Sequence, residues 1–350
     1  MSLDKDFLKS LLAAPGPSSF ESKPAKLWRD KAESYGANLH TDAYGNSFAT
    51  FGKAQKPIIM LAGHIDEIGL IVTYIDDDGF IYFKGIGGWD SQQLVGQRVR
   101  INGYKAELVG LIGKKAIHLM DADDSKKVSK IKDLWIDIGA KDGAEAKEHV
   151  RVGDTAVIEQ PYIELLNGHV ASKAIDNRIG AYIVLESARR AAEANAQVVA
   201  VATVQEEIGH IGAGVATFGL EPDVAIAVDV THATDVPGVS KKENGDVPFG
   251  SGPTLAVGST VHRGVLNELI ATAEAEGIDY RLEAAPSRTY TDGDDTAKAR
   301  AGVPTGIVSI PNRYMHSPNE MITLEDLENV ISLITAFIMR LDETVTFKQP

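Results

Sequence analysis

The 350-residue sequence contains no cysteine, which excludes disulfide bonds and thiolate metal ligands. It also lacks a long hydrophobic run, because the longest runs, such as residues 57–62, fall far below the roughly 20 residues that a membrane-spanning helix needs. The start of the chain shows no basic segment followed by an apolar one, which a secretion signal would have. We therefore expect a cytoplasmic protein with no membrane partner.

Basic residues are also scarce. The chain has 35 Lys and Arg against 49 Asp and Glu, a net charge of −14, and no basic block interleaved with aromatic residues. This balance predicts no nucleic-acid partner. The 44% apolar and 24% charged content, with 33 Gly and 14 Pro spread along the chain, is typical of a globular protein.

What is present is a pattern of helices alternating with apolar strands at the two ends of the chain. The expected helices are 3–12, a segment that opens on a capping box at Ser18 and Glu21 and runs to Gly36, 176–194, 265–276 and 324–341. The expected strands are 57–62, 198–204, 224–229 and 305–310. Such alternation predicts an α/β fold with a mostly parallel sheet sandwiched by helices.

The middle of the chain differs from its ends. Between residues 68 and 166, short β-type runs are separated by Asp-Gly, Asn-Gly and Gly-rich turns. Closely spaced strands of this kind predict a small β-barrel. We expect a domain formed by 1–67 and 167–350, interrupted by an inserted β-barrel domain at 68–166.

Polar side chains follow several of the expected buried strands. They are His64, Asp66, Asp176, Glu206, Glu207, Asp229 and His316. Each has an ordinary explanation by itself: a core histidine, a helix cap at Asp176, or solvated strand ends. In open α/β sheets, however, ligands bind outside the carboxyl ends of the strands, so one site would collect all seven.

The residue types in this set predict a metal centre. Imidazole and carboxylate ligands without thiolates suit Zn²⁺, Co²⁺ or Mn²⁺, and one tetrahedral ion could not use so many carboxylates. Two ions that share a bridging carboxylate would use them all. If the segment after Val204 stays extended, Glu206 and Glu207 face opposite ways, so that one could bind a cation while the other reaches a substrate water.

Five motifs in combination identify a family. They are Gly63-His64-Ile65-Asp66-Glu67, Lys173-Ala174-Ile175-Asp176-Asn177-Arg178, Val204-Gln205-Glu206-Glu207-Ile208-Gly209, Asp229-Val230-Thr231-His232 and Tyr314-Met315-His316-Ser317-Pro318. With them the chain resembles the co-catalytic metallo-aminopeptidases that form tetrahedral (TET) particles. These include glutamyl and deblocking aminopeptidases, and some members are labelled endoglucanase or cellulase.

The resemblance covers the whole chain and implies a zinc-peptidase-like fold, peptide substrates with a free N-terminus and a homo-oligomer, a tetrahedral dodecamer. The inserted domain would serve oligomerisation and control access. By the resemblance, His64 and Asp229 would hold one ion, Glu207 and His316 the other, and Asp176 would bridge both. It also implies a cis peptide bond after Asp176.

The same resemblance implies the roles of two more carboxylates. Glu206 would be the general base for a water that bridges the two divalent ions, and Asp66 would hydrogen-bond His64. One departure from the family pattern is His210, which stands where relatives more often have an apolar residue.

A second departure concerns the substrate pocket. Thr291 and Asp292 match a segment near the first specificity pocket of the family, and Arg288 and Tyr290 are bulky where relatives have small residues. If Arg288 reaches the pocket, its guanidinium would favour N-terminal Glu or Asp. If Arg288 is a surface residue, we expect a preference for neutral and apolar residues.

Two other functions stay open at this stage. A glycoside hydrolase would use two carboxylates and no metal, which leaves His64, Asp229 and His316 without a role. A non-catalytic peptide-binding scaffold would be expected to have lost a ligand or the base, and every one is present in the sequence.

Overall fold

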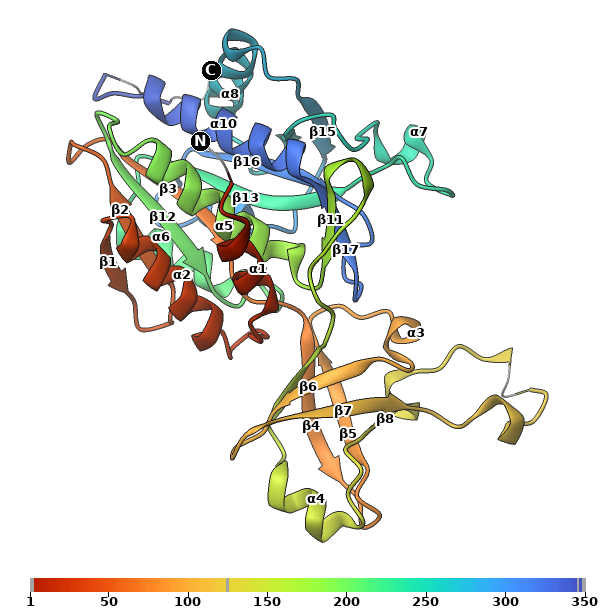
Figure 1. Cartoon of the computed structure of the whole chain (residues 1–350). Helices are drawn as coiled ribbons and strands as arrows, with labels where there is room; N and C mark the ends of the chain where they lie inside the picture. Colours follow the sequence, from red (N-terminus) through yellow and green to blue (C-terminus); the bar gives the residue numbers. More distant parts are fainter. Residues whose placement is uncertain (1–2, 124–125, 345, 348–350) are drawn as a thin grey trace.

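The computed structural model describes residues 3–123, 126–344 and 346–347. Figure 1 shows an α/β part, made from both ends of the chain, and a barrel that stands to one side of it. Among the helices of these described residues, none is both long and apolar enough to span a lipid bilayer.

An eight-stranded sheet forms the centre of the α/β part. Its strands, in spatial order, are β1 (Asn38–Thr41), β2 (Ser47–Phe51), β12 (Gln197–Thr203), β3 (Ile58–His64), β13 (Val224–His232), β16 (Thr305–Asn312), β14 (Thr254–Gly258) and β15 (Arg281–Ala285). The central strands β12, β3, β13 and β16 are parallel, as predicted. β2 and β14 pair with this parallel core in antiparallel fashion, so the sheet is mixed toward its edges.

Helices cover both faces of the sheet, which confirms the predicted α/β sandwich. They are α1 (Lys5–Ala13), α2 (Ser22–Ser34), α5 (Ile175–Arg190), α6 (Ile211–Leu220), α8 (Arg263–Glu276) and α10 (Leu324–Arg340). In β3, Ile59 and Leu61 join the core that contains α1, α2, α5 and α10, whereas Met60 and Ala62 pack on the α6 side. Because both faces are buried, the strand is continuously apolar in sequence.

The barrel has its own core and six strands. It closes in the order β4 (Gly69–Ile75), β5 (Ile81–Ile86), β8 (Trp135–Asp137), β7 (Glu107–Gly113), β6 (Arg98–Asn102) and β9 (Thr155–Ile158). Short helices connect the strands: α3 (Ser91–Leu94), α4 (Gly143–His149), η1 (Ile117–Leu119) and η3 (Ile131–Asp133). The predicted inserted barrel is therefore confirmed as an element of the fold.

A small antiparallel sheet follows where the chain returns from the barrel. It consists of β10 (Ile163–Glu164), β11 (His169–Ser172) and β17 (Glu320–Thr323). The remaining short elements are η4 (Leu166–Gly168), α7 (Lys241–Asn244) and α9 (Gly293–Thr296). This sheet joins the segment before α5 to the segment after β16, and both segments lead into the candidate site.

The capping box expected at Ser18 and Glu21 is wrong. α2 begins at Ser22, and Glu21 makes no side-chain cap there. Instead, the Ser18 hydroxyl donates to Asp66 Oδ2 at 2.6 Å, and Glu21 Oε1 accepts the backbone N–H of Gln205 at 3.1 Å. These two side chains satisfy distant polar groups, which a local sequence pattern could not show.

A close approach of two glycines sets the distance between β3 and α5. A Cβ added to Gly63 would lie 2.5 Å from the carbonyl carbon of Gly180, closer than real Cβ contacts allow. Only glycine at position 63 therefore lets α5 pack this tightly on β3. The contact brings the start of α5 next to the end of β3.

Candidate metal centre

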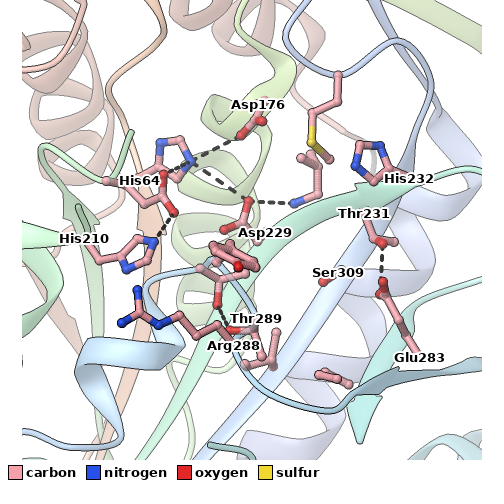
Figure 2. A pocket seen from close by; sticks show the side chains of 18 of the residues that line it. His64, Asp176, His210, Asp229, Thr231, His232, Glu283, Arg288, Thr289 and Ser309 are labelled. Atoms are coloured by element: carbon pink, nitrogen blue, oxygen red, sulfur yellow. Dashed lines mark hydrogen bonds and ion pairs between the residues drawn. The ribbon is translucent and has the colours of Figure 1, made fainter. Parts of the chain in front are cut away.

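A pocket of about 630 Å³ opens beside the carboxyl ends of the parallel strands. Six of the seven residues predicted for the site line it: His64, Asp176, Glu206, Glu207, Asp229 and His316. The seventh, Asp66, is fully buried behind His64. Figure 2 shows His64, Asp176 and Asp229 turned toward one another in this pocket.

His64, the last residue of β3, lies among three carboxylates. Its Nε2 is 3.2 Å from Asp176 Oδ1, 3.5 Å from Glu206 Oε2 and 4.0 Å from Asp229 Oδ1. The ligand-type atoms of His64, Glu206 and Asp229 all lie within 4.8 Å of one another.

His316 forms a second group on the other side of Asp176. Its Nε2 is 3.4 Å from Asp176 Oδ2 and 3.3 Å from Glu207 Oε2. Each oxygen of Asp176 thus faces a different imidazole. This is the arrangement that a carboxylate shared between two ions would have.

The position of Asp176 is fixed by a residue that sequence reasoning missed. Glu320, buried at the start of β17, accepts the backbone N–H of Asp176 at 2.7 Å through Oε2 and that of His316 at 2.8 Å through Oε1. Asp176 is not the cap of α5, since the helix begins at Ile175 and the backbone angles of Asp176 and Asn177 are non-helical. The Asp176–Asn177 peptide bond is cis, as the resemblance implied.

The segment that contains Glu206 and Glu207 is not extended, so the condition under which the two carboxylates would face opposite ways is not met. β12 ends at Thr203, Gln205 has a φ of +58°, and the backbone N–H groups of Gly209 and His210 both return to the carbonyl of Glu206. The two carboxylates still meet different neighbours, because Glu206 faces His64 and Glu207 faces His316.

Side chains hold this segment by its backbone. The N–H groups of residues 204–207 donate in turn to Asn46 Oδ1 at 3.0 Å, Glu21 Oε1 at 3.1 Å, Asp66 Oδ1 at 3.1 Å and Asp66 Oδ2 at 3.2 Å. Asp66 Oδ1 also lies 3.4 Å from His64 Nδ1. Asp66 therefore holds the backbone of the carboxylate pair and lies beside the histidine.

A buried ionic cluster ties β3 to α5 below the site. Glu67 accepts from Lys173 Nζ at 2.7 Å and from Arg178 Nη2 at 2.8 Å, and Arg178 also donates to the carbonyl of Ile65 at 3.1 Å. All three charged groups are buried and paired, as burial of charge requires. The cluster fixes the two segments that carry His64 and Asp176.

The pocket concentrates negative charge. Burial raises the pKa values of Glu206 and Asp229 well above the usual range and also raises that of Glu207. Burial opposes the charged form of His316, but its hydrogen bonds to Asp176 and Glu207 raise its pKa to about 11. Without a metal ion, the negative charge of the pocket is reduced only by protons bound to these carboxyl groups and to the imidazoles.

A divalent cation fits this set of donors. Within the described residues, no hydrogen-bond donor reaches the buried oxygen Glu207 Oε1. A second possible metal group, His64, Asp176 and Glu207, offers donor atoms within 4.8 Å of one another. Hard carboxylate oxygens and imidazole nitrogens are the ligands that first-row divalent ions accept.

The residues predicted for the substrate pocket divide into two groups. Arg288, Tyr290 and Thr291 line the pocket, with Arg288 near His210 in Figure 2. Asp292 differs, because its side chain is buried and hydrogen-bonded to Thr203 rather than lining the pocket. Burial raises the pKa of Asp292 to about 6.

Sequence reasoning missed Thr231 and Glu283 in the pocket wall, which hydrogen-bond to each other at 2.8 Å.

Comparison with known proteins gives consistent matches over the whole chain. The model of the M42 glutamyl aminopeptidase family matches residues 45–333. A lysyl aminopeptidase of Pyrococcus furiosus is 34% identical over 344 residues, which are 97% of this chain and 98% of that protein.

Solved structures show the same fold. A TET aminopeptidase from a marine sediment archaeon of the Thaumarchaeota superposes with a TM-score of 0.92 at 34% identity, covering 97% of this chain and 96% of that one. A dodecameric TET1 structure, PhTET1-12s, has a TM-score of 0.86 at 30% identity, covering 97% of this chain and 100% of that one. On the extent of these matches, the chain belongs to the M42 glutamyl aminopeptidase family.

Proposed function

We propose that this protein is a metal-dependent aminopeptidase that uses two divalent ions in each subunit. The observation that carries the proposal is the position of Asp176, whose two oxygens face His64 and His316 separately. Membership of an aminopeptidase family supports the same activity.

The ligand sets are those that the family resemblance implies, and the distances around Asp176 are compatible with them. His64 and Asp229 would hold one ion, His316 and Glu207 the other, and Asp176 would contact both. The mixture of nitrogen and oxygen donors suits Zn²⁺ or Co²⁺, and Mn²⁺ is a further candidate. When bound, such ions lower the pKa of water and stabilise negative charge on a carbonyl oxygen.

Glu206 is the proposed general base. Its carboxylate is buried at the pocket wall, and burial raises its pKa, which makes the carboxylate a stronger base. It would take the proton of the attacking water and pass it to the leaving amine. Asp66 would keep His64 and the backbone of Glu206 in place during this step.

The substrate would be a peptide with a free N-terminus. A free α-amino group can bind a metal ion or a carboxylate of this pocket, an interaction that an internal peptide bond lacks. This preference explains removal of terminal residues rather than cleavage within a chain.

The barrel would serve assembly of a homo-oligomer, a tetrahedral dodecamer, and would limit access to the pocket. Its surface exposes large apolar side chains: Tyr74, Tyr104, Val109, Leu111, Ile117, Leu119, Val128 and Val152. On β7, Val109 and Leu111 are 52% and 55% exposed although they lie on a regular strand. Apolar surface of this kind is typical of an interface, and the similar PhTET1-12s structure is a dodecamer.

A glycoside hydrolase is the weaker alternative. Two carboxylates would suffice for it, and His64 and His316 would then have no chemical task beside Asp176. A peptide-binding scaffold would need neither a general base nor two ligand groups.

Two neighbouring substitutions test the proposal. Glu206→Gln should keep both ions and lose at least ~10²-fold in kcat, because it removes a general base. Glu207→Gln should instead lower the metal content, because it removes a ligand. The measurements are elemental analysis and turnover of an aminoacyl-anilide. Exchanged phenotypes would reverse the two roles, and full activity in both variants would contradict the mechanism.

A further inference from the structure

His210 is a pocket residue that the proposed ligand set does not use. Its Nε2 lies 3.3 Å from Glu206 Oε1, and the other oxygen of Glu206 lies 3.5 Å from His64 Nε2. Figure 2 shows the ring of His210 pointing into the pocket on the side of His64. Both oxygens of the proposed base therefore face an imidazole.

The other side of the His210 ring faces a second carboxylate. Nδ1 is 3.7 Å from Asp295 Oδ2, and the remaining oxygen of Asp295 pairs with Lys298. The side chains become more buried along this row: Lys298 is 69% exposed, Asp295 20%, His210 17% and Glu206 8%. These four side chains form a continuous path from the surface to Glu206, and none of them is a proposed metal ligand.

The backbone fixes the direction of the ring. His210 has a φ of +54°, a left-handed conformation that is uncommon for residues other than glycine, and it directly precedes α6. Its N–H donates to the carbonyl of Glu206 at 2.9 Å. The same turn that presents Glu206 thus presents His210 beside it.

We infer that His210 is a positioning residue that holds the Glu206 carboxyl group both before and after it takes up a proton. A neutral imidazole has one N–H donor and one acceptor nitrogen. It can therefore donate to Glu206 as a carboxylate or accept from Glu206 as a carboxylic acid. An aliphatic side chain can do neither, and an ammonium group can only donate. The inference rests on the proposed role of Glu206 as the base.

The test compares His210→Leu with His210→Gln. Leucine removes the partner of Glu206, whereas the glutamine amide keeps both a donor and an acceptor. We expect His210→Leu to lose about tenfold or more in kcat, with KM and metal content within about twofold of the wild type. His210→Gln should recover most of that loss, and Asp295→Asn should fall between the two. His40→Leu, at an exposed histidine on β1, controls for the loss of one imidazole.

The outcomes separate the inference from the proposed function. Full kcat in His210→Leu, equal loss in both variants, or loss of metal from His210→Leu would overturn the positioning role. Chelation-sensitive turnover of the wild type in the same series tests the proposed function itself. Crystal structures of the two variants give a readout apart from activity: the Glu206 carboxyl group should shift in His210→Leu and keep its place in His210→Gln. An unmoved Glu206 in His210→Leu would also overturn the inference.

Discussion

At the scale of single residues, the site is an excess of buried carboxylates that needs a cation. Asp176, Asp229, Glu206 and Glu207 meet in one pocket, and an uncompensated buried charge costs several kcal/mol or more. Their ion-pair partners are imidazoles, which are themselves metal ligands when neutral. The arrangement is therefore unfavourable for a protein without metal and suitable for one with it.

Arg288 provides a residue-scale prediction about specificity. Its guanidinium lines the pocket and can bind a substrate carboxylate through two hydrogen bonds. We expect Arg288→Ala to lower the ratio of kcat/KM for Glu-anilide to that for Leu-anilide by about tenfold, roughly 1.4 kcal/mol. Arg281→Ala is the matched control, because Arg281 is exposed at the start of β15 and does not line the pocket. An unchanged ratio would exclude Arg288 from recognition of the side chain.

Residue type and strand-end position predicted which side chains would meet, but not what holds them. His64 and Glu207 follow apolar strands and Asp176 precedes a helical apolar pattern, so a local pattern points to them. Three side chains accept hydrogen bonds from backbone N–H groups far away in the sequence. They are Glu320, Glu21 and Asn46, and the separations are 144, 184 and 158 residues. Hydrogen bonds over such separations depend on the completed fold, so no spacing of residues in the sequence reveals them.

At the scale of elements, the turn between β12 and α6 has an irregular backbone. Gln205 and His210 both have positive φ, and four consecutive N–H groups are bound by side chains rather than by a neighbouring strand. Such backbone persists only where the surroundings hold it. We therefore expect the side chains that hold it to affect stability.

Glu21 offers a test of this element through pH. Burial, and then the negative charge of Asp66, raise the pKa of Glu21 from 4.5 to about 7. Between these values the folded protein binds a proton that the unfolded chain has lost, so this group lowers the stability as pH rises through that window. The full effect amounts to about 3 kcal/mol at most.

The variant for this test is Glu21→Gln, whose amide oxygen can still accept the N–H of Gln205. Its free energy of unfolding relative to wild type should increase between pH 5 and pH 8, measured by urea denaturation. A difference that stays constant over this range would show that Glu21 does not titrate as the structure implies.

The elements themselves could be predicted where burial leaves a clear pattern. The central strands are apolar on both faces, and α5, α8 and α10 follow helical periodicity, so both were expected from the sequence. The edge strands β1 and β15 are short and partly exposed, and no continuous apolar run identifies them. The antiparallel pairing at the edges also depends on the route of the connections, which sequence periodicity does not contain.

At the scale of the whole molecule, the barrel is the part that the catalytic sheet does not need. It has a separate hydrophobic core, and it presents apolar side chains outward on β7 and on the segment around η1. Burial of such side chains against other subunits would stabilise an assembly at roughly 25 cal/mol for each Å² removed from water.

The proposed assembly predicts a mass. Light scattering at micromolar concentration should give a particle near twelve times the 37.5 kDa of the chain. Replacing Val109 and Leu111 together by Asp should reduce the particle size while leaving the site residues in place, because both lie on the barrel surface. A stable wild-type monomer would contradict the assembly.

The central claim is that peptide hydrolysis from a free N-terminus depends on divalent metal ions held at this pocket. The most direct measurement is turnover of Leu-anilide and of its Nα-acetylated form before chelation, after exhaustive chelation, and after Zn²⁺, Co²⁺ or Mn²⁺ is restored. The account predicts that only the free-amine substrate is hydrolysed, that chelation abolishes this turnover, and that a divalent ion restores it. Hydrolysis that survives exhaustive chelation, or equal turnover of the acetylated substrate, would contradict the account.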